Sequence, residues 1–594
     1  MRCPYPLLRE LTAAEIPVAP TPPADIALVA PVSVVNAAGL QAMQGGHDYS
    51  IDADIDLAGV TWTPLNFNSA TLTVIEGNDH TISNLTLSSA FGLFKGFIAT
   101  ITGTGPTQVR NLKFANCSVS AATNVAICCA YIGSAAPNVH IKNVSVTDSS
   151  ITVRSAKGGI VIGSIDGNAA YVSGCTVTDC TITGGNNNTQ NLGGMIGALY
   201  EQSPDTVTNI VNCTVSGGTM NIAAERTYRC GGFIGEAYTS PTSEERNHGF
   251  YNCSTSMDII YIGAASGTAF IVQGIGGFIG NEINTIAVSC HATGNLTFTT
   301  DGTWTFADEF TAIGGYVGDS SCWETLIDCY ATGTITFEDA GDTPKITNVG
   351  GFGGFCDYDV QMLRCYSTGN LVFKTDISQL CYIGGFISET RSAAGYATGT
   401  LSRCWSEGDI TFDGNITTAL LATGGTNQGR GLVGGFIGWM GVDTTVGIHI
   451  EDCYAWGSVI LNGTYPANLT VSGFAGAWKL DIADIVINRC YCAQTDDKWG
   501  SGYTDQLPSD VDSHGFGGGA GSYGTSLMTG TEIYYDSETS GLNTSPIGTA
   551  ETTSWLQTKT NFTAAGWDFD TIWIMECEGA AGFGQLFMVN DFCG

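Results

Sequence analysis

The sequence predicts an all-β protein: a parallel β-solenoid (β-helix) of roughly 10–12 coils with an N-terminal arm and a C-terminal cap. Three observations lead to this prediction. The segment Gly-Gly-Phe-Ile-Gly recurs along the chain, a second motif centred on a cysteine follows it, and short runs alternate between apolar and polar residues. Together they describe one small structural unit repeated many times.

The glycine motif sets the repeat length. From Cys129 to Ser472 it makes nine intervals over 343 residues, a mean of about 38, which falls in the range of solenoids and propellers. Glycine pairs are expected at tight corners that need a positive φ or a close approach of two backbones. Clear copies begin at Gly193, Gly231, Gly276, Gly314, Gly350, Gly384 and Gly434, and degenerate copies begin at Cys129, Gly159 and Ser472.

The cysteine motif predicts an interior ladder. One copy of this motif reads Asp328-Cys329-Tyr330-Ala331-Thr332-Gly333, and in another copy Val144 occupies the position of the cysteine. A slot that accepts cysteine or valine is small and apolar, and a buried free cysteine behaves as a small hydrophobe. We therefore expect reduced core thiols and no metal site at Cys117, Cys175, Cys213, Cys253, Cys290, Cys329, Cys365, Cys404, Cys453 and Cys490.

The tail of each cysteine motif predicts a short strand. Thr334-Ile-Thr-Phe337 and Asp409-Ile-Thr-Phe412 alternate with a period of two, which indicates a strand with one buried face. A propeller would need about four strands per unit and a closed ring of about eight blades at most, so more than ten irregular units favour an open coil. The predicted organisation is an arm over 1–35, opening coils over 36–100, the solenoid over 101–500, a glycine-rich connector over 501–529 and a closing segment over 530–594.

Composition excludes several classes of partner. The 594 residues include 55 acidic and 21 basic residues, a formal charge of −34, so nucleic acid and anionic lipid are poor partners. No apolar stretch is long enough to predict a membrane-spanning helix. Seven of the 16 prolines lie in the first 31 residues, which predicts an extended arm or tether. The start at Met1 lacks the apolar run of a secretion signal, so we expect folding in the cytoplasm.

The repeats resemble a known family. Gly231-Gly-Phe-Ile-Gly235 and its copies, followed by Cys-Tyr-Ala-Thr-Gly, are similar to the GLUG-motif repeats of bacterial surface adhesins, of noncatalytic regions of some immunoglobulin-cleaving metallopeptidases and of phage tail proteins. The likeness includes the opening coil around Tyr49 and the closing Gly566-Trp567-Asp568-Phe569, and it covers residues 36 to about 590. It implies a rigid stalk that displays loops for attachment.

The resemblance and the arm together favour a virion tail spike or fibre subunit. Such a subunit would be a homotrimer that docks on other tail proteins through its N-terminal arm and meets a host surface glycan or receptor. It would need no cofactor and no membrane insertion. Two alternatives remain open: a bacterial cell-surface adhesin or S-layer-like protein, and a polysaccharide lyase or glycosidase on a β-helix scaffold.

Tryptophans near the glycine corners are the candidate binding residues. Exposed tryptophan is costly unless it stacks on a ligand, a sugar or a partner chain, so they predict a glycan- or receptor-binding stripe. The alternative is that their rings close the coil or pack a subunit interface. The three residues are Trp323, Trp439 and Trp478.

No catalytic residue is assigned. None of the seven histidines lies in His-Glu-x-x-His, which argues against a zinc peptidase. Glycoside chemistry needs two carboxylates roughly 5–10 Å apart, and acidic residues that could pair across coils are Asp319 with Glu324 beside Trp323, Asp357 with Asp359, and Glu244 with Glu245. Asp52, Asp54 and Asp56 could bind calcium but are better explained as residues that satisfy turns of the first coil.

Overall fold

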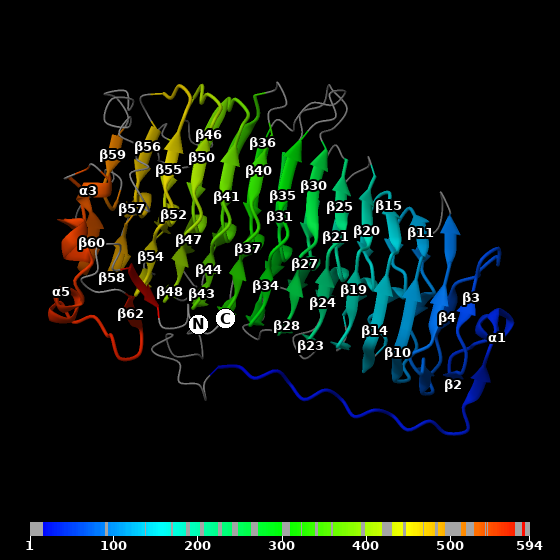
Figure 1. The fold of residues 1–594 in the computed structure, drawn as a ribbon. Coiled ribbons are helices and arrows are strands. Elements are labelled where there is room, and N and C mark those ends of the chain that lie inside the picture. The colour runs from blue at the N-terminus through cyan, green and yellow to red at the C-terminus, as the bar shows by residue number, and fades with distance from the viewer. Residues whose placement is uncertain are drawn as a thin grey trace. The chain divides into compact units, whose positions relative to one another are not determined.

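The computed structural model confirms an all-β, parallel β-solenoid (Figure 1). It falls into two compact units: an N-terminal unit of Ala13–Thr325 with Cys329–Gly333, and a C-terminal unit that holds Leu326–Asp328 and Thr334–Gly594. The structure describes residues 16–88, 93–136, 138–167, 170–185, 190–201, 207–223, 228–239, 248–262, 271–299, 309–321, 324–338, 343–357, 360–393, 398–418, 431–443, 447–466, 469–480, 485–493, 512–517, 528–540, 542, 544–576 and 585–588.

Each coil passes through four sheets, which we name by their place in the repeat. A pre-turn strand ends in the glycine pair, a post-turn strand follows it, the cysteine strands come next, and a closing strand completes the coil. Equivalent strands of successive coils pair in parallel and in register, as in Ile196↔Ile234 and Ile234↔Ile279. Seven described coils of the N-terminal unit and five of the C-terminal unit carry a pre-turn strand, in line with the predicted number.

The strands of the N-terminal unit fall into these four groups. The pre-turn strands are β8 (Phe94–Lys95), β12 (Asn124–Val125), β16 (Lys157–Gly159), β21 (Gln190–Gly193), β26 (Tyr228–Gly231), β31 (Ile271–Gly276) and β36 (Glu309–Gly314). The post-turn strands are β4 (Leu65–Phe67), β9 (Ile98–Ile101), β13 (Cys129–Ile132), β17 (Ile162–Asp166), β22 (Ile196–Glu201), β27 (Ile234–Thr239), β32 (Ile279–Ile283) and β37 (Val317–Ser321). The cysteine strands are β1 (Val32–Val34), β2 (Asp48–Ile51), β3 (Ile55–Asp56), β5 (Thr73–Glu76), β6 (Thr81–Ser83), β10 (Thr107–Ala115), β14 (Val139–Thr147), β18 (Ala170–Ser173), β19 (Thr176–Thr178), β23 (Thr208–Val211), β24 (Thr214–Ser216), β28 (His248–Tyr251), β29 (Ser254–Thr255), β33 (Thr285–Val288), β34 (His291–Ala292) and β39 (Tyr330–Ala331). The closing strands are β7 (Thr86–Ser88), β11 (Ser118–Ala121), β15 (Ser150–Val153), β20 (Thr181–Gly184), β25 (Thr219–Ile222), β30 (Asp258–Ile262) and β35 (Leu296–Thr299).

The C-terminal unit repeats the plan. Its pre-turn strands are β41 (Lys345–Gly350), β46 (Gln379–Gly384), β51 (Gly431–Gly434), β56 (Leu469–Ser472) and β59 (Asp512–His514), and its post-turn strands are β42 (Gly353–Asp357), β47 (Ile387–Ala393), β52 (Ile437–Asp443) and β57 (Ala475–Leu480). The cysteine strands are β38 (Thr325–Ile327), β43 (Gln361–Leu363), β44 (Tyr366–Ser367), β48 (Gly399–Ser402), β49 (Trp405–Ser406), β53 (Ile448–Glu451), β54 (Tyr454–Ala455), β58 (Ile485–Cys492), β60 (Met528–Asp536) and β61 (Thr549–Glu551). The closing strands are β40 (Ile335–Phe337), β45 (Leu371–Phe373), β50 (Ile410–Phe412) and β55 (Val459–Leu461), and an antiparallel pair is formed by β62 (Trp573–Glu576) and β63 (Gln585–Met588). The described helices are α1 (Ala37–Gln41) in the N-terminal unit and α3 (Ser537–Ser540), α4 (Thr553–Leu556) and α5 (Lys559–Ala564) in the C-terminal unit.

The glycine pair serves close approach of backbones. A Cβ added at Gly231 would lie 2.0 Å from the carbonyl oxygen of Ile234, and one added at Gly232 would lie 2.3 Å from that of Gly277 in the next coil. The phenylalanine after the pair points into the core and stacks on its counterparts, with ring centroids 4.8 Å apart for Phe233 and Phe278. Small residues are therefore required at the turn because strands and coils meet there at contact distance.

The bend with positive φ lies elsewhere, immediately before the ladder residue. Asn212 has a φ of 54° and Asn252 a φ of 52°, and these residues precede Cys213 and Cys253. Asparagine tolerates this left-handed conformation better than most residues. The amide of Asn252 also donates to Oδ1 of Asn212 at 3.1 Å, so the bend residues bond from coil to coil.

The ladder thiols satisfy backbone groups at this bend. Cys253 Sγ donates to the carbonyl of Tyr251 in its own coil at 3.4 Å and to that of Ile210 in the preceding coil at 3.5 Å. Burial raises the pKa of the Cys290 thiol well above its ordinary value, so this thiol is neutral and unreactive. Every cysteine that the structure describes is a buried thiol, and none of these described cysteines forms a disulfide.

The predicted ladder is wrong at one position. Pairing runs Leu112↔Val144, so Leu112 and not Cys117 occupies the slot before Val144 and Cys175. Cys117 is buried but belongs to a second column, and its backbone N–H donates to Ser149 Oγ at 3.0 Å. This early coil contains two left-handed bends, at Asn111 and Asn116. Asn116 precedes Cys117 and so resembles the Asn-Cys motif in sequence, but it lies one bend after the ladder position.

Two segments outside the predicted solenoid contact or join its coils. Residues 16–31 belong to the predicted arm or tether over 1–35, and they lie along the N-terminal unit (the blue segment of Figure 1), where Asp25 pairs with Lys142 at 2.7 Å and Pro20 accepts from the Tyr171 hydroxyl at 2.6 Å. Residues 512–517 are part of a coil and not a connector, because β59 pairs with β56 and Phe516 stacks on Phe474.

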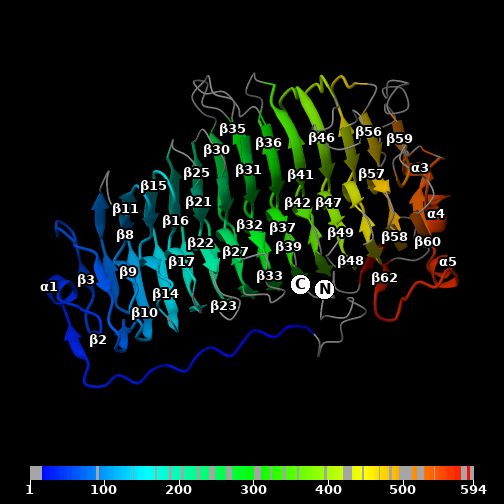
Figure 2. The same ribbon diagram turned by 180° about the vertical axis from the view of Figure 1, so that it is seen from behind.

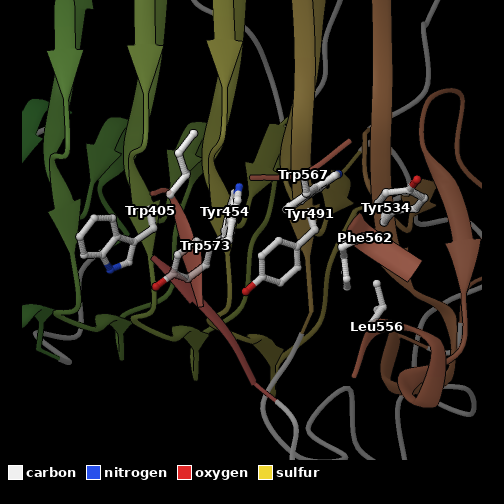
Figure 3. Close-up of a cluster of buried hydrophobic side chains, with 9 residues drawn as sticks. Trp405, Tyr454, Tyr491, Tyr534, Leu556, Phe562, Trp567 and Trp573 are labelled. Carbon is white, nitrogen blue, oxygen red and sulfur yellow. The ribbon is translucent and has the colours of Figure 1, made fainter. Parts of the chain in front are cut away.

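The closing segment packs on an aromatic column in the C-terminal unit. Residues after the ladder cysteines stack from coil to coil, and the segment from α4 to β62 covers them (Figure 3). Trp573 is completely buried, and its indole N–H donates to Asp452 at 3.3 Å. The buried members are Trp405, Tyr454, Tyr491, Tyr534, Leu556, Phe562, Trp567, Ile572 and Trp573.

Substitution of a bend residue tests the left-handed position. Asn212→Val should lower the free energy of unfolding by about 1–2 kcal/mol more than Asn212→Gly, because a β-branched residue is strained at positive φ. Both changes remove the contact with Asn252, so the difference between the two unfolding free energies reports the backbone strain alone. Denaturant unfolding of both variants provides the measurement, and equal stabilities would contradict the assignment.

Substitution of a turn glycine tests the close approach. Gly232→Ala should destabilise the chain by about 1–3 kcal/mol because its Cβ would collide with Gly277. Gly399→Ala is the matched control, since the nearest atom to its added Cβ is 3.8 Å away. Thermal unfolding followed by circular dichroism compares them, and a tolerated Gly232→Ala variant would disprove the contact.

Candidate functional site

A row of half-exposed side chains crosses five consecutive coils of the N-terminal unit. The strands that carry it are the pre-turn strands β8, β16 and β26 and the post-turn strands β13, β17, β22 and β27; Figure 2 shows β17, β22 and β27 side by side. We call this row the Tyr200 stripe. Its members are Phe94, Tyr131, Lys157, Asp166, Tyr200, Arg229 and Tyr238.

The stripe begins with aromatic contacts. The rings of Phe94 and Tyr131 stack with centroids 4.6 Å apart. Burial, followed by the charge of the neighbouring Asp166, raises the pKa of the Tyr131 hydroxyl, which is therefore a neutral hydrogen-bonding group. Asp166 pairs with Lys157 at 3.4 Å, so aromatic and charged side chains follow one another without a break.

The same row continues through Tyr200. The ammonium of Lys157 lies 3.9 Å from the centroid of the Tyr200 ring, a cation–π contact. Tyr238 lies beside Tyr200 in the next coil, at a centroid distance of 6.2 Å. Half-buried aromatic faces and edges thus line the stripe on both sides of the Lys157–Asp166 pair.

A buried network fixes the stripe from below. Glu236 has no exposed side-chain surface, and it accepts from the Tyr200 hydroxyl and pairs with Arg229. Asn191 donates to Glu236 Oε2 at 2.6 Å and to the Tyr200 hydroxyl at 2.6 Å. The side chain of Arg229 keeps 40 % of its surface exposed, so a buried carboxylate positions a cation that solvent can reach.

Repeat spacing explains why these residues meet. Lys157, Asn191 and Arg229 each stand two residues before the first glycine of the turn and pair in one column. Tyr200 and Tyr238 each stand seven residues after it and pair in another. The sequence reasoning missed the stripe, although aligning the repeats on the glycine pair would have revealed both columns.

A related cluster lies in the C-terminal unit around Trp439. Asn348 donates to Glu389 at 2.5 Å, and Glu389 pairs with Arg391 at 2.5 Å. The Arg391 guanidinium lies 5.1 Å from the Phe355 ring centroid and 5.6 Å from that of Trp439. The pattern of amide, buried glutamate and half-exposed arginine is therefore used in both units.

The predicted tryptophan stripe is wrong where the structure describes it. Trp439 is only 7 % exposed, because its ring stacks on Tyr382 and lies against Gly441, which has no side chain to hold it away. Trp478 is 6 % exposed and packs against Gly517. Both rings complete coils, as the alternative interpretation held, and Trp323 lies outside the described residues.

The proposed acidic pairs do not form a surface site in the described part of the chain. Glu324 is completely buried and Asp357 is 5 % exposed, so neither side chain faces a polymer in solution. Asp319 is half-buried and accepts from Gln273 at 3.2 Å. Asp359, Glu244 and Glu245 lie outside the described residues.

The three aspartates of the first coil satisfy turns, as expected. Asp56 accepts from Asn84 and from the backbone N–H of Ala58, both at 2.8 Å. Asp54 accepts from the backbone N–H of Thr81 at 2.9 Å, and Asp52 accepts from Ser50 at 2.6 Å.

Among the described residues no group of three histidine, cysteine or acidic side chains is arranged to hold a metal ion. No helix within the described ranges has the length and apolar character that a membrane span requires.

Comparisons with known proteins add little. No family model and no curated protein matches the chain. Among solved structures, the chain is similar to one described as "a putative immunoglobulin A1 protease from Bacteroides ovatus", with 18% identity over 58% of this chain and 77% of that one, at a TM-score of 0.26. Similarity at this level carries no functional argument.

A buried carboxyl that the sequence did not reveal lies in the N-terminal unit. Glu282 is 1 % exposed and accepts one hydrogen bond, from Thr285 Oγ1 to its Oε2 at 3.0 Å. Burial raises its pKa to about 8, so the side chain is mostly protonated at neutral pH. Glu282 pairs with Ser320 of the next coil, and both residues are buried, so the carboxyl belongs to the core.

The raised pKa of Glu282 predicts a pH dependence of stability. The folded chain holds this proton more tightly than the unfolded chain, so its contribution is complete below pH 4.5 and is lost as pH rises through 8. Glu282→Gln should therefore unfold at a temperature several degrees above the parent at pH 9 and near it at pH 5. Glu338→Gln, at a half-exposed ion pair with Lys374, is the control. Equal pH profiles for parent and Glu282→Gln chains would contradict the shift.

Proposed function

We propose that the chain is an attachment protein that presents a β-solenoid to a cell-surface glycan or receptor. The observation that carries this proposal is the Tyr200 stripe, a continuous half-exposed row of aromatic and charged side chains on stacked, hydrogen-bonded coils. Lys157 and Asp166 keep 22 % and 23 % of their side-chain surface exposed and Arg229 keeps 40 %, so a ligand can reach charged groups as well as aromatic rings along this row.

The setting that we favour is a virion tail spike or fibre. Buried thiols without disulfides throughout the described residues fit folding in a reducing compartment, where a virion protein is made. The likeness of the repeats to those of phage tail proteins supports the same setting. We further propose a homotrimer that contacts other tail proteins through its N-terminal arm, and a bacterial surface adhesin is the competing proposal.

Labelling and cell binding test this function. An antibody to the chain, applied to the native source in negative-stain microscopy, should decorate the tails of particles; decoration of cell envelopes would support the adhesin instead. The purified chain should bind cells of the same source and lose at least 10-fold in binding after their surface glycans are oxidised with periodate. Cells that never retain the chain would refute an attachment role.

A further inference from the structure

We propose that the Tyr200 stripe binds an extended, uncharged polysaccharide along the axis of the stacked coils. This inference rests on the proposed function and names the ligand class of its site. Contacts follow one another from Phe94 in β8 to Tyr238 in β27, one coil at a time, at the spacing of about 4.8 Å between neighbouring strands. A linear polymer can meet such a row along its length, whereas a compact ligand would use only part of it.

The chemistry of the stripe favours sugar over peptide or nucleic acid. The strands β13, β17 and β22, which carry the middle of the stripe, are paired on both edges, so none of these three can accept an added peptide strand. The stripe has two cations and no basic excess, which argues against a phosphate backbone. Aromatic rings suit the apolar faces of sugars, and charged groups suit their hydroxyls, which both donate and accept.

Charge decides between neutral and acidic polymers. Lys157 is paired with Asp166 and Arg229 with the buried Glu236, so the stripe together with Glu236 carries no net charge. The whole chain has a formal charge of −34, which repels a polyanion at long range. The exposed N–H groups of the Arg229 guanidinium can still donate to sugar hydroxyls. A neutral acceptor can take such a hydrogen bond even though Glu236 already balances the charge of Arg229.

The test uses surface polysaccharide from cells that bind the chain, separated by anion exchange into neutral and acidic fractions. In affinity electrophoresis the neutral fraction should retard the intact chain, and the retardation should be unchanged between about 50 and 500 mM salt. Tyr131→Ala and Tyr238→Ala should each weaken binding about 5- to 10-fold, whereas Tyr238→Phe should bind like the parent. Tyr330→Ala is the matched control, since Tyr330 is half-buried and stacked on His291 in the cysteine sheet.

Each outcome separates the two proposals. Retardation by the acidic fraction alone, or weakening by Tyr330→Ala equal to that by Tyr238→Ala, would overturn the stripe as a neutral-glycan site. Retardation by neither fraction, with cell binding intact, would also overturn it and leave attachment through another receptor. If the unmodified chain does not bind cells at all, the proposed function itself is refuted.

Discussion

Parallel, in-register pairing of equivalent residues in successive coils is the interaction on which the rest of this structure depends. Each residue of a coil meets its counterpart about 4.8 Å away, so a side chain is acceptable only if it packs against the side chain at the same position of the next coil. Stacked phenylalanines, inward thiols and amides that bond to amides meet this condition. Glycine meets it where two backbones must touch, as at Gly232 and Gly277.

The same constraint explains the choice of cysteine at the bend. The carbonyl of Tyr251 at the bend accepts from the backbone N–H of Asn212 in the neighbouring coil at 2.9 Å, and its second lone pair can accept another donor. The thiol is small enough to stack without a clash and can donate weakly to such carbonyls, as Cys253 does to Ile210 and Tyr251. Valine at Val144 fills the volume but makes no such bond, so the slot accepts it without requiring it.

Repeat spacing made the fold predictable because every copy contributes to one periodic signal. Details that depend on a single coil were not predictable in this way. Cys117 has the right neighbours in sequence but follows the second bend, and only the pairing of Leu112 with Val144 reveals the difference. The orientation of Trp439 depends on Gly441 and Tyr382, which are not part of the repeat motif. The Tyr200 stripe was missed because its residues differ in type from coil to coil and share only their distance from the glycine pair.

Stacking also explains how an acidic chain can hold a neutral stripe. A column of like charges about 4.8 Å apart would repel along its whole length, so charged positions near the turn alternate with partners of opposite sign. Lys157, Asn191 and Arg229 form one column, and Asp166 and Glu236 meet them from the facing strands. The repulsion that stacking would create is removed locally, while the acidity that keeps copies of the chain apart remains on the rest of the molecule. Recognition can then depend on ring faces and hydrogen bonds instead of net charge.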